Sequence, residues 1–358
     1  MPHTRQLDFW LLGATALTAA VGVVLVASAS APWAREYYRV AEGTFAARQA
    51  VAVMLGIGAM LAAAFLPLRR LTDIRAALPL LALTWVALAI PYVQDPVAGT
   101  ARWLQLPGLS LQPSALAKLT LPLALASLIA WQRSRERSER ETFGLASGLI
   151  AVTCALVLFE PDLGSAVLLA VAAAGLLVLS GSPWRYLTSY ALFAIPVAVI
   201  AILVKPYRLE RIRAFFGETG YQVHQSLIAL GNGGLLGQGP GESVQKLFFL
   251  PQPHTDFIFA IAGEELGLVG TSALLALLAV VVVRGLRVAA RAATPAAALL
   301  AGGLALTIAV QALLNASVCL NLLPAKGLPL PLVSSGGSDV LATMAMVGLL
   351  LNVGKESS

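Results

Sequence analysis

Charged residues are scarce in this sequence, and their scarcity excludes an ordinary soluble domain. Only 12% of the 358 residues are Asp, Glu, Lys or Arg, against about a quarter in soluble globular proteins. Hydrophobic residues make up 58% of the chain. Too few polar side chains are present to cover a folded surface, so the composition predicts an integral membrane protein.

Cysteine is rarer still, and its rarity argues against a disulfide framework. The two cysteines, Cys154 and Cys319, both lie within apolar runs. We expect each to be a small core residue rather than half of a disulfide. The formal charge of +6 falls in short clusters between apolar runs. Membrane topology explains such clusters, so we expect no nucleic-acid partner.

Long apolar runs recur along nearly the whole chain, each close to the roughly 20 residues that cross a bilayer as a helix. We therefore predict an all-α fold, a single polytopic membrane domain over residues 1–358 with about ten transmembrane helices. Residues 9–27 resemble a signal sequence, but no cleavage site is convincing, so we interpret them as a retained first helix. The predicted spans are residues 9–30, 49–67, 76–92, 113–131, 143–159, 163–182, 186–204, 257–283, 296–321 and 338–354.

The orientation follows from the positive charges. With the N-terminus in the cytoplasm, every loop on that side carries arginine, and the C-terminus is cytoplasmic as well. The longest connection, residues 205–255 between the seventh and eighth helices, is then extracytoplasmic. The cytoplasmic cations are Arg69, Arg70, Arg75, Arg133, Arg135, Arg137, Arg140, Arg185, Arg284, Arg287, Arg291 and Lys355.

Three extracytoplasmic loops are predicted to be structured. Residues 93–112 mix Pro and Gly with apolar residues and should pack on the membrane face. Residues 205–255 should contain an amphipathic helix at 222–230, followed by the run GNGGLLGQGPGE. We interpret this run as a flexible turn rather than a phosphate loop, because it lacks the Walker spacing and no strand precedes it. Residues 322–337 break the helix at membrane depth, which requires burial in protein or a wet cavity.

Polar residues gather where the long loop meets the eighth helix. His254, Thr255 and Asp256 would lie at the water boundary, whereas Glu264 and Glu265 lie roughly 12 Å deeper at 1.5 Å per helical residue. Carboxylates at that depth are costly unless they are paired or hydrated. Together with the broken helix and the long loops, these acids predict one outward-facing cavity.

Several cations outside the membrane are not needed for orientation. Lys118 is the most informative, because it lies within the fourth span, more than a turn into the membrane. Cations around a cavity with carboxylates suit an anionic substrate that carries hydroxyls and a lipid tail. The alternative for Arg35 and Arg39 is contact with lipid phosphates. The other extracytoplasmic cations are Arg48, Arg102, Lys205, Arg208, Arg211, Arg213, Lys246 and Lys326.

Two aspartates have competing interpretations. Asp256 precedes the eighth predicted helix and Asp162 precedes the sixth, so either could be an N-cap. A carboxylate held near a hydroxyl could instead act as a general base. His254 lies close to Asp256, but one histidine without a second ligand is weak evidence for a zinc site.

Four separated stretches resemble the SEDS family of shape, elongation, division and sporulation proteins, and the resemblance covers nearly the whole chain. The family has a ten-helix fold and polymerises peptidoglycan by glycosyl transfer from lipid II. Its members work in the bacterial cytoplasmic membrane with a class B penicillin-binding protein, which cross-links the strands. The matching stretches are ARWLQLPGLSLQPSALAK (101–118), FEPDLGSAVLL (159–169), GYQVHQSLIALGNGGLLGQGPGESVQKLFFLPQPHTDFIFAIAGEELGLVG (220–270) and NLLPAKGLPLPLVSSGGS (321–338).

The resemblance implies roles for particular residues. Asp256 matches the essential aspartate, the base for the acceptor sugar hydroxyl, with the growing strand as donor and its lipid diphosphate as leaving group. Arg102, Lys118 and Lys326 match cations that suit this diphosphate. A divalent cation, Mg²⁺ or Mn²⁺, is also implied, without an assigned site. The remaining substrate-binding candidates in the matched stretches are Asp162, His254, Glu264 and Ser334.

The chain also departs from the family pattern. Ala115 stands where Glu is usual, Ser335 where Tyr is usual and Glu160 where Gln is usual; Phe248 stands where division-type members often have an acid. GESVQKLFFLPQPHTDF and the lysine of LPAKG favour the division type, whereas SGSPWR favours the elongation type. Two other functions fit the cavity, a lipid II flippase and a non-catalytic scaffold for the penicillin-binding protein. A carboxylate near the outer boundary favours the enzyme, because a transporter places its polar groups near the midplane.

Overall fold

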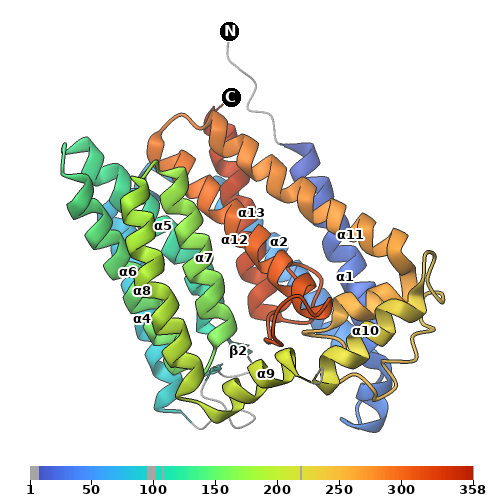
Figure 1. Ribbon diagram of the computed structural model, residues 1–358. Helices are drawn as coiled ribbons and strands as arrows, with labels where there is room; N and C mark the ends of the chain where they lie inside the picture. Colours follow the sequence, from blue (N-terminus) through green and yellow to red (C-terminus); the bar gives the residue numbers. More distant parts are fainter. Residues whose placement is uncertain (1–7, 95–101, 107–108, 218–219, 358) are drawn as a thin grey trace.

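Residues 8–94, 102–106, 109–217 and 220–357 are described by the computed structural model, in which they form one bundle of long helices (Figure 1). The ten predicted spans are all present as helices, and nine of these are long and apolar enough to cross a membrane. They are α1 (Phe9–Glu36), α2 (Thr44–Phe65), α4 (Ile74–Ala89), α5 (Pro113–Ser134), α6 (Glu139–Phe159), α7 (Leu163–Leu179), α8 (Trp184–Leu203), α11 (Ile258–Arg291), α12 (Pro295–Cys319) and α13 (Gly337–Ser357). The prediction of a multi-pass helical membrane protein is confirmed.

The remaining elements are short and lie mainly at one end of the bundle. We call this end, which carries β1, β2, α9, α10 and residues 320–336, the loop end; α1 begins and α13 finishes at the opposite end (Figure 1). Strands β1 and β2 pair antiparallel, with Leu104 opposite Leu111. The bounds are α3 (Leu68–Leu71), η1 (Ile90–Tyr92), β1 (Leu104–Leu106), β2 (Leu109–Leu111), α9 (Pro206–Phe216) and α10 (Tyr221–Gly233).

The loop between α8 and α11 is more regular than predicted. The helix expected at residues 222–230 is α10, but α9 was missed, although Pro206 at its first turn is a usual helix start. Residues 95–101 of the loop between α4 and α5 lie outside the described residues, so the predicted packing of this loop on the membrane face stays a prediction. The strand pair within that loop was not predicted.

Helices α7 and α11 end at other residues than predicted, and the residues at these ends explain the differences. Helix α7 has 17 residues, fewer than predicted, because Gly181 adopts φ 74° just after its end and Pro183 follows. Helix α11 continues to Arg291, beyond the predicted end at residue 283. Arginine is a good helix former, and its long side chain can reach water from the last turns. The helix therefore extends beyond its apolar run.

The glycine-rich run is not a flexible turn, contrary to our interpretation. Helix α11 breaks at Gly267 (φ 66°, ψ −168°), and the run pairs with the backbone groups that the break leaves without helical partners. Leu268 N and Val269 N donate to the carbonyls of residues 234 and 235, at 2.9 and 3.1 Å. The carbonyls of residues 264 and 265 accept from Gln238 N and Gly239 N, at 2.9 and 3.1 Å. Buried backbone groups must be paired, so the two segments hold each other.

Burial separates central from peripheral helices. Helices α5, α12 and α13 are mostly buried within the described structure, and α13 packs along α2. Helix α8 has no buried residue and lies at the edge of the bundle, beside α6 (Figure 1). Polar residues on central helices therefore face protein or cavity, whereas the described protein leaves every residue of α8 at least partly exposed.

Candidate functional site

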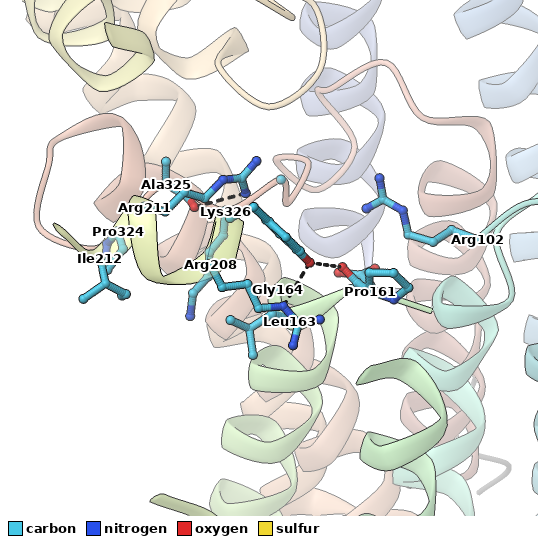
Figure 2. Close-up of a pocket in the computed structure, with 13 residues that line it drawn as sticks. Arg102, Pro161, Leu163, Gly164, Arg208, Arg211, Ile212, Pro324, Ala325 and Lys326 are labelled. Atoms are coloured by element: carbon cyan, nitrogen blue, oxygen red, sulfur yellow. Dashed lines mark hydrogen bonds between the residues drawn. The ribbon is translucent and has the colours of Figure 1, made fainter. Parts of the chain in front are cut away.

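A cavity of about 420 Å³ opens at the loop end of the bundle. It is lined by α5, α7, α9, α10 and α13 together with the segments before α5, α11 and α13. A smaller pocket of about 50 Å³ adjoins it and shares Arg102, Arg211, Ala325, Lys326 and Gly327 (Figure 2). The charged residues of the larger cavity are Arg102, Lys118, Arg211, Asp256, Lys326 and Asp339.

Hydrogen bonds hold the backbone of Asp256 in place, whereas its carboxylate is free. Asn315 Nδ2 on α12 donates to the Asp256 carbonyl at 2.8 Å and to Leu328 O at 2.7 Å. Ser334 Oγ donates to Thr255 O at 2.6 Å. Within the described residues, no donor is bonded to the Asp256 carboxylate. Helix α11 begins at Ile258 without a side-chain cap, so the helix-cap interpretation of Asp256 is wrong.

The surroundings of Asp256 raise its pKa to about 6. Burial is the largest cause, and the charge of Asp162 acts in the same direction, whereas Arg102 and Arg211 oppose them. A carboxylate with this pKa is ionised at neutral pH and accepts a proton more readily than an ordinary aspartate. The carboxylate also has little room, because a Cβ added at Gly327 would lie 2.8 Å from Asp256 Oδ2.

The cations reach the cavity from separate parts of the chain. Figure 2 shows Arg102 across the smaller pocket from Arg211 on α9, with Lys326 on the loop before α13. Arg211 donates to Ala325 O at 3.4 Å, and burial lowers the pKa of Lys326. Arg208 also lines the smaller pocket, but it donates to Ala201 O at 2.8 Å and to Tyr207 Oη at 2.9 Å. Arg208 therefore anchors α9 rather than offering a free charge.

Lys118 lies at the cavity wall in a buried ion pair with Asp339 of α13. Gln311 of α12 binds both partners: its Oε1 accepts from Lys118 Nζ at 3.1 Å, and its Nε2 donates to Asp339 Oδ2 at 2.9 Å. Ala115, where the family usually has Glu, lies one turn before Lys118 on α5. In this chain the acidic partner of Lys118 comes from another helix.

Asp162 is a helix cap, the alternative that the sequence left open. Its carboxylate accepts from Ser165 N at 2.9 Å and from Ser165 Oγ at 2.7 Å, at the start of α7. Gln112 Nε2, which lines the larger cavity, also donates to it, at 3.2 Å. Asp162 itself lines only the smaller pocket. Its contribution to the larger cavity is the placement of Gln112 and its negative charge.

Three other predicted substrate-binding residues do not line either pocket and contact other parts of the protein instead, so their binding of substrate stays a prediction. His254 is buried against Phe45, with ring centroids 4.9 Å apart, and burial lowers its pKa to about 4. The Ser334 hydroxyl forms hydrogen bonds with backbone groups of the protein. Glu264 is fully buried and accepts from Ser243 Oγ, and from Gln245 N at 3.1 Å. A buried carboxylate needs such partners, and here they fasten the long loop to α11.

Glu265 has the same structural role as Glu264. Its carboxylate pairs with Lys246 Nζ at 2.8 Å, and both side chains are buried. Lys246 Nζ also donates to Ser28 Oγ of α1 at 2.8 Å. The pair therefore ties the long loop to α1 and α11, and it explains Lys246 without any substrate.

Four residues of the site were not predicted as site residues: Arg211, Gln311, Asn315 and Asp339. A signal was present for two of them, because Thr307, Gln311 and Asn315 recur every four residues on an otherwise apolar helix. This spacing places all three on one face. Polar residues on one face of a membrane helix favour a buried or wet environment. No comparable pattern singles out Asp339, whereas Arg211 is one of the cations that membrane orientation does not require.

An apolar cavity of about 590 Å³ lies next to the charged pockets, between α6, α7 and α8. Leu163 lines both this cavity and the smaller charged pocket. The remaining walls are mainly apolar residues such as Ile150, Ala166 and Phe193. A charged site and an apolar groove thus meet at the start of α7.

Fold and site define a polytopic membrane protein whose charged cavity combines one free carboxylate with several cations. A family model described as cell cycle protein, covering FtsW, RodA and SpoVE, matches residues 9–358. The chain belongs to this family, which confirms the resemblance to SEDS proteins.

Named relatives and solved structures agree with this assignment. Probable peptidoglycan glycosyltransferase FtsW of Halorhodospira halophila is 40% identical over 366 residues, covering 98% of this chain and 91% of the relative. The protein of the same name from Geobacter metallireducens is 38% identical over 353 residues, covering 96% and 93%. A chain of a peptidoglycan synthase complex, studied for its coordination of polymerization and crosslinking, superposes with a TM-score of 0.79 at 29% identity, covering 98% of both chains. Rod shape determining protein RodA of Thermus thermophilus superposes with a TM-score of 0.72 at 29% identity, covering 97% of this chain and 96% of that one.

Proposed function

We propose that this protein is a peptidoglycan glycosyltransferase that polymerises lipid II into glycan strands. The observation that carries the proposal is the free carboxylate of Asp256, with a pKa raised to about 6, in a cavity with Arg102, Arg211 and Lys326. A glycosyl transfer from a lipid diphosphate needs one base and positive charge around the leaving group. The names of the FtsW relatives support the same reaction.

The reaction is a single displacement at the anomeric carbon of the growing strand. The acceptor sugar hydroxyl of lipid II attacks this carbon, and its proton passes to the Asp256 carboxylate. The bond from the anomeric carbon to the diphosphate oxygen breaks, and the diphosphate leaves with the electron pair. Arg102, Arg211 and Lys326 stabilise the charge that develops on this leaving group. The α-linked donor gives a β-linked product, as expected for one displacement with inversion.

The lipid tail of the donor fits the apolar cavity between α6, α7 and α8. Leu163 lies at its junction with the charged pocket, so a chain attached to a diphosphate would pass directly from one to the other. Burial of a polyprenyl chain in an apolar groove is favourable, at roughly 25 cal/mol per Å² removed from water.

The proposed location is the bacterial cytoplasmic membrane, with the loop end on its extracytoplasmic side and both termini in the cytoplasm. The arginine clusters at the opposite end support this orientation. The proposed partner is a class B penicillin-binding protein that cross-links the strands. Its support is the likeness to a chain of a peptidoglycan synthase complex.

A divalent cation, Mg²⁺ or Mn²⁺, would bind together with the substrate rather than at a preformed protein site. Within the described residues, no three His, Cys, Asp or Glu side chains are grouped for a metal. Magnesium often binds through one or two carboxylates and the phosphates of a substrate, and Asp256 could supply such an oxygen. When bound, the cation would neutralise charge on the departing diphosphate.

The test is strand synthesis by the purified protein with its penicillin-binding partner, lipid II and divalent cation. Asp256→Asn should abolish glycan polymer on a gel without lowering thermal stability or weakening partner binding. The substitution removes the base but keeps the shape of the side chain. Strand synthesis at the original rate by a folded Asp256→Asn variant would remove Asp256 from the mechanism.

A further inference from the structure

Lys118, Gln311 and Asp339 form a buried polar triad that joins three central helices. Their side chains come from α5, α12 and α13, and the residues are 3%, 0% and 5% exposed. Gln311 Nε2 also donates to Pro329 O at 2.8 Å, so the loop before α13 is attached to the same point. Lys118 and Asp339 line the large cavity. The triad is therefore both a packing element and part of the cavity wall.

The bonding of the Lys118 ammonium leaves one donor for a ligand. An ammonium group has three N–H donors. One is bonded to Asp339 and one to Gln311 Oε1, and within the described residues the third has no protein acceptor. Gln311 Nε2 in turn restrains the Asp339 carboxylate, at 3.1 Å from Oδ1 and 2.9 Å from Oδ2. The ammonium is held on two sides at the edge of the cavity.

We propose that Asp339 is a positioning residue for the leaving diphosphate, acting through Lys118 and resting on the proposed function. Asp339 keeps the ammonium at the cavity wall, with its third N–H directed to a diphosphate oxygen. Asp339 lies in the first turn of α13, where the helix dipole favours a negative charge. Without Asp339, the flexible lysine stem could carry the ammonium away to a better hydrated place.

A comparison with a second buried ion pair, Lys246–Glu265, supports a role beyond packing. Lys246 and Glu265 are similarly buried, but neither lines the cavity, and Lys246 Nζ has three acceptors: Ser28 Oγ, Gly241 O and Glu265 Oε1. A purely structural lysine thus uses all of its donors within the protein. Lys118 keeps one donor unused and lines a cavity that contains three further cations.

The experiment measures binding of undecaprenyl diphosphate in detergent to the full-length protein, beside strand synthesis from lipid II. Asp339→Asn should weaken diphosphate binding and lower the rate of strand synthesis at saturating lipid II, each by about 10- to 100-fold, because the ammonium is displaced. Asp339→Glu should restore both to within a few fold. A glutamate keeps the charge, which a role in positioning requires.

The double variant Lys118→Met, Asp339→Asn separates positioning from folding. It leaves no unpaired buried charge, so it should melt near the temperature of the unmodified protein, yet bind diphosphate as weakly as Asp339→Asn. Normal binding and synthesis by the folded double variant, or no recovery with Asp339→Glu, would overturn the inference.

The control is Asp8→Asn, which breaks the Asp8–Arg284 ion pair at the opposite end of the bundle. Asn is also a good helix cap, so diphosphate binding should not change. If the unmodified protein binds diphosphate but makes no glycan, the proposed function fails while the positioning role is still measured. If the unmodified protein binds no diphosphate, the inference itself is wrong.

Discussion

Asp256 combines two properties that oppose each other, accessibility to substrate and burial of a charge. Its backbone is fixed by Asn315, whereas no donor within the described residues is bonded to its carboxylate. An unpaired carboxylate in a partly buried place is costly, and the raised pKa expresses this cost. At the scale of the residue, catalysis and stability therefore make opposite demands.

The activity should fall as the pH drops through about 6, because Asp256 must be ionised to accept a proton. Arg102 lowers the pKa of Asp256. Arg102→Gln should therefore move the midpoint of this acid limb to higher pH, in addition to weakening donor use. Initial rates of strand synthesis between pH 5 and pH 8 measure the midpoint. Arg185→Gln is the control, and a profile without an acid limb would contradict the base assignment.

Ionisation of Asp256, which activity requires, should lower the stability of the folded protein. The pKa of Asp256 in the folded state, about 6, lies above the ordinary aspartate value of 3.8, so ionisation destabilises the folded state at neutral and higher pH. Asp256→Asn should therefore be more stable than the unmodified protein at pH 8, by about 1–3 kcal/mol. The difference should shrink as the pH falls through 6 and vanish below about 4, where both side chains are neutral. Thermal melts in detergent measure it; a variant less stable at pH 8 would contradict the pKa.

At the scale of elements, the broken helix α11 and the glycine-rich run form one unit. The run approaches α11 so closely that a Cβ at Gly237 would lie 2.2 Å from Glu265 O. The buried acids Glu264 and Glu265 fasten the same loop through side-chain contacts. Backbone pairing and buried carboxylates together explain why so polar a segment is held at the edge of the bundle.

Gly237→Ala should therefore be strongly destabilising, by about 3 kcal/mol or more, because the methyl group collides with backbone and φ is 85°. Gly234→Ala is the matched control, since φ is 52° there but nothing lies within 4 Å of an added Cβ. Gly234→Ala should lower the free energy of unfolding only by the backbone strain, about 1–3 kcal/mol. Melting temperatures compare the two. Equal losses would mean that the close approach to α11 does not stabilise the fold.

At the scale of the whole molecule, α1 begins and α13 ends at the same end of the bundle (Figure 1), as the ten predicted spans require. The cavity lies at the other end, so the proposed polymerisation of lipid II requires the loop end to face the extracytoplasmic side. The chain has only two cysteines, both in helices or at a helix end. New cysteines can therefore report the orientation after Cys154→Ala and Cys319→Ala.

A cysteine replacing Glu242 at the loop end should react with a membrane-impermeant maleimide applied to spheroplasts. A cysteine replacing Ala293, between α11 and α12, should react only after the membrane is permeabilised. Both positions are exposed in the structure, so access to water is not limiting. The reverse labelling pattern would contradict the proposed orientation and, with it, the extracytoplasmic cavity.

The sequence by itself determined the ten helices, because the length of an apolar run is a local property that hydrocarbon thickness sets. It also singled out Asp256, Arg102, Lys118 and Lys326, all of which line the cavity. The extent as one domain over residues 1–358 stays a prediction.

Only the tertiary structure decided which polar groups satisfy one another. Glu264 is bonded to Ser243 rather than exposed to a substrate, Lys118 is paired with Asp339, and Asn315 holds the backbone of Asp256. These partners are 21, 221 and 59 residues apart in the chain. A charged residue in an apolar stretch of the sequence indicates that a partner is needed. The packing of the helices determines which partner is within reach.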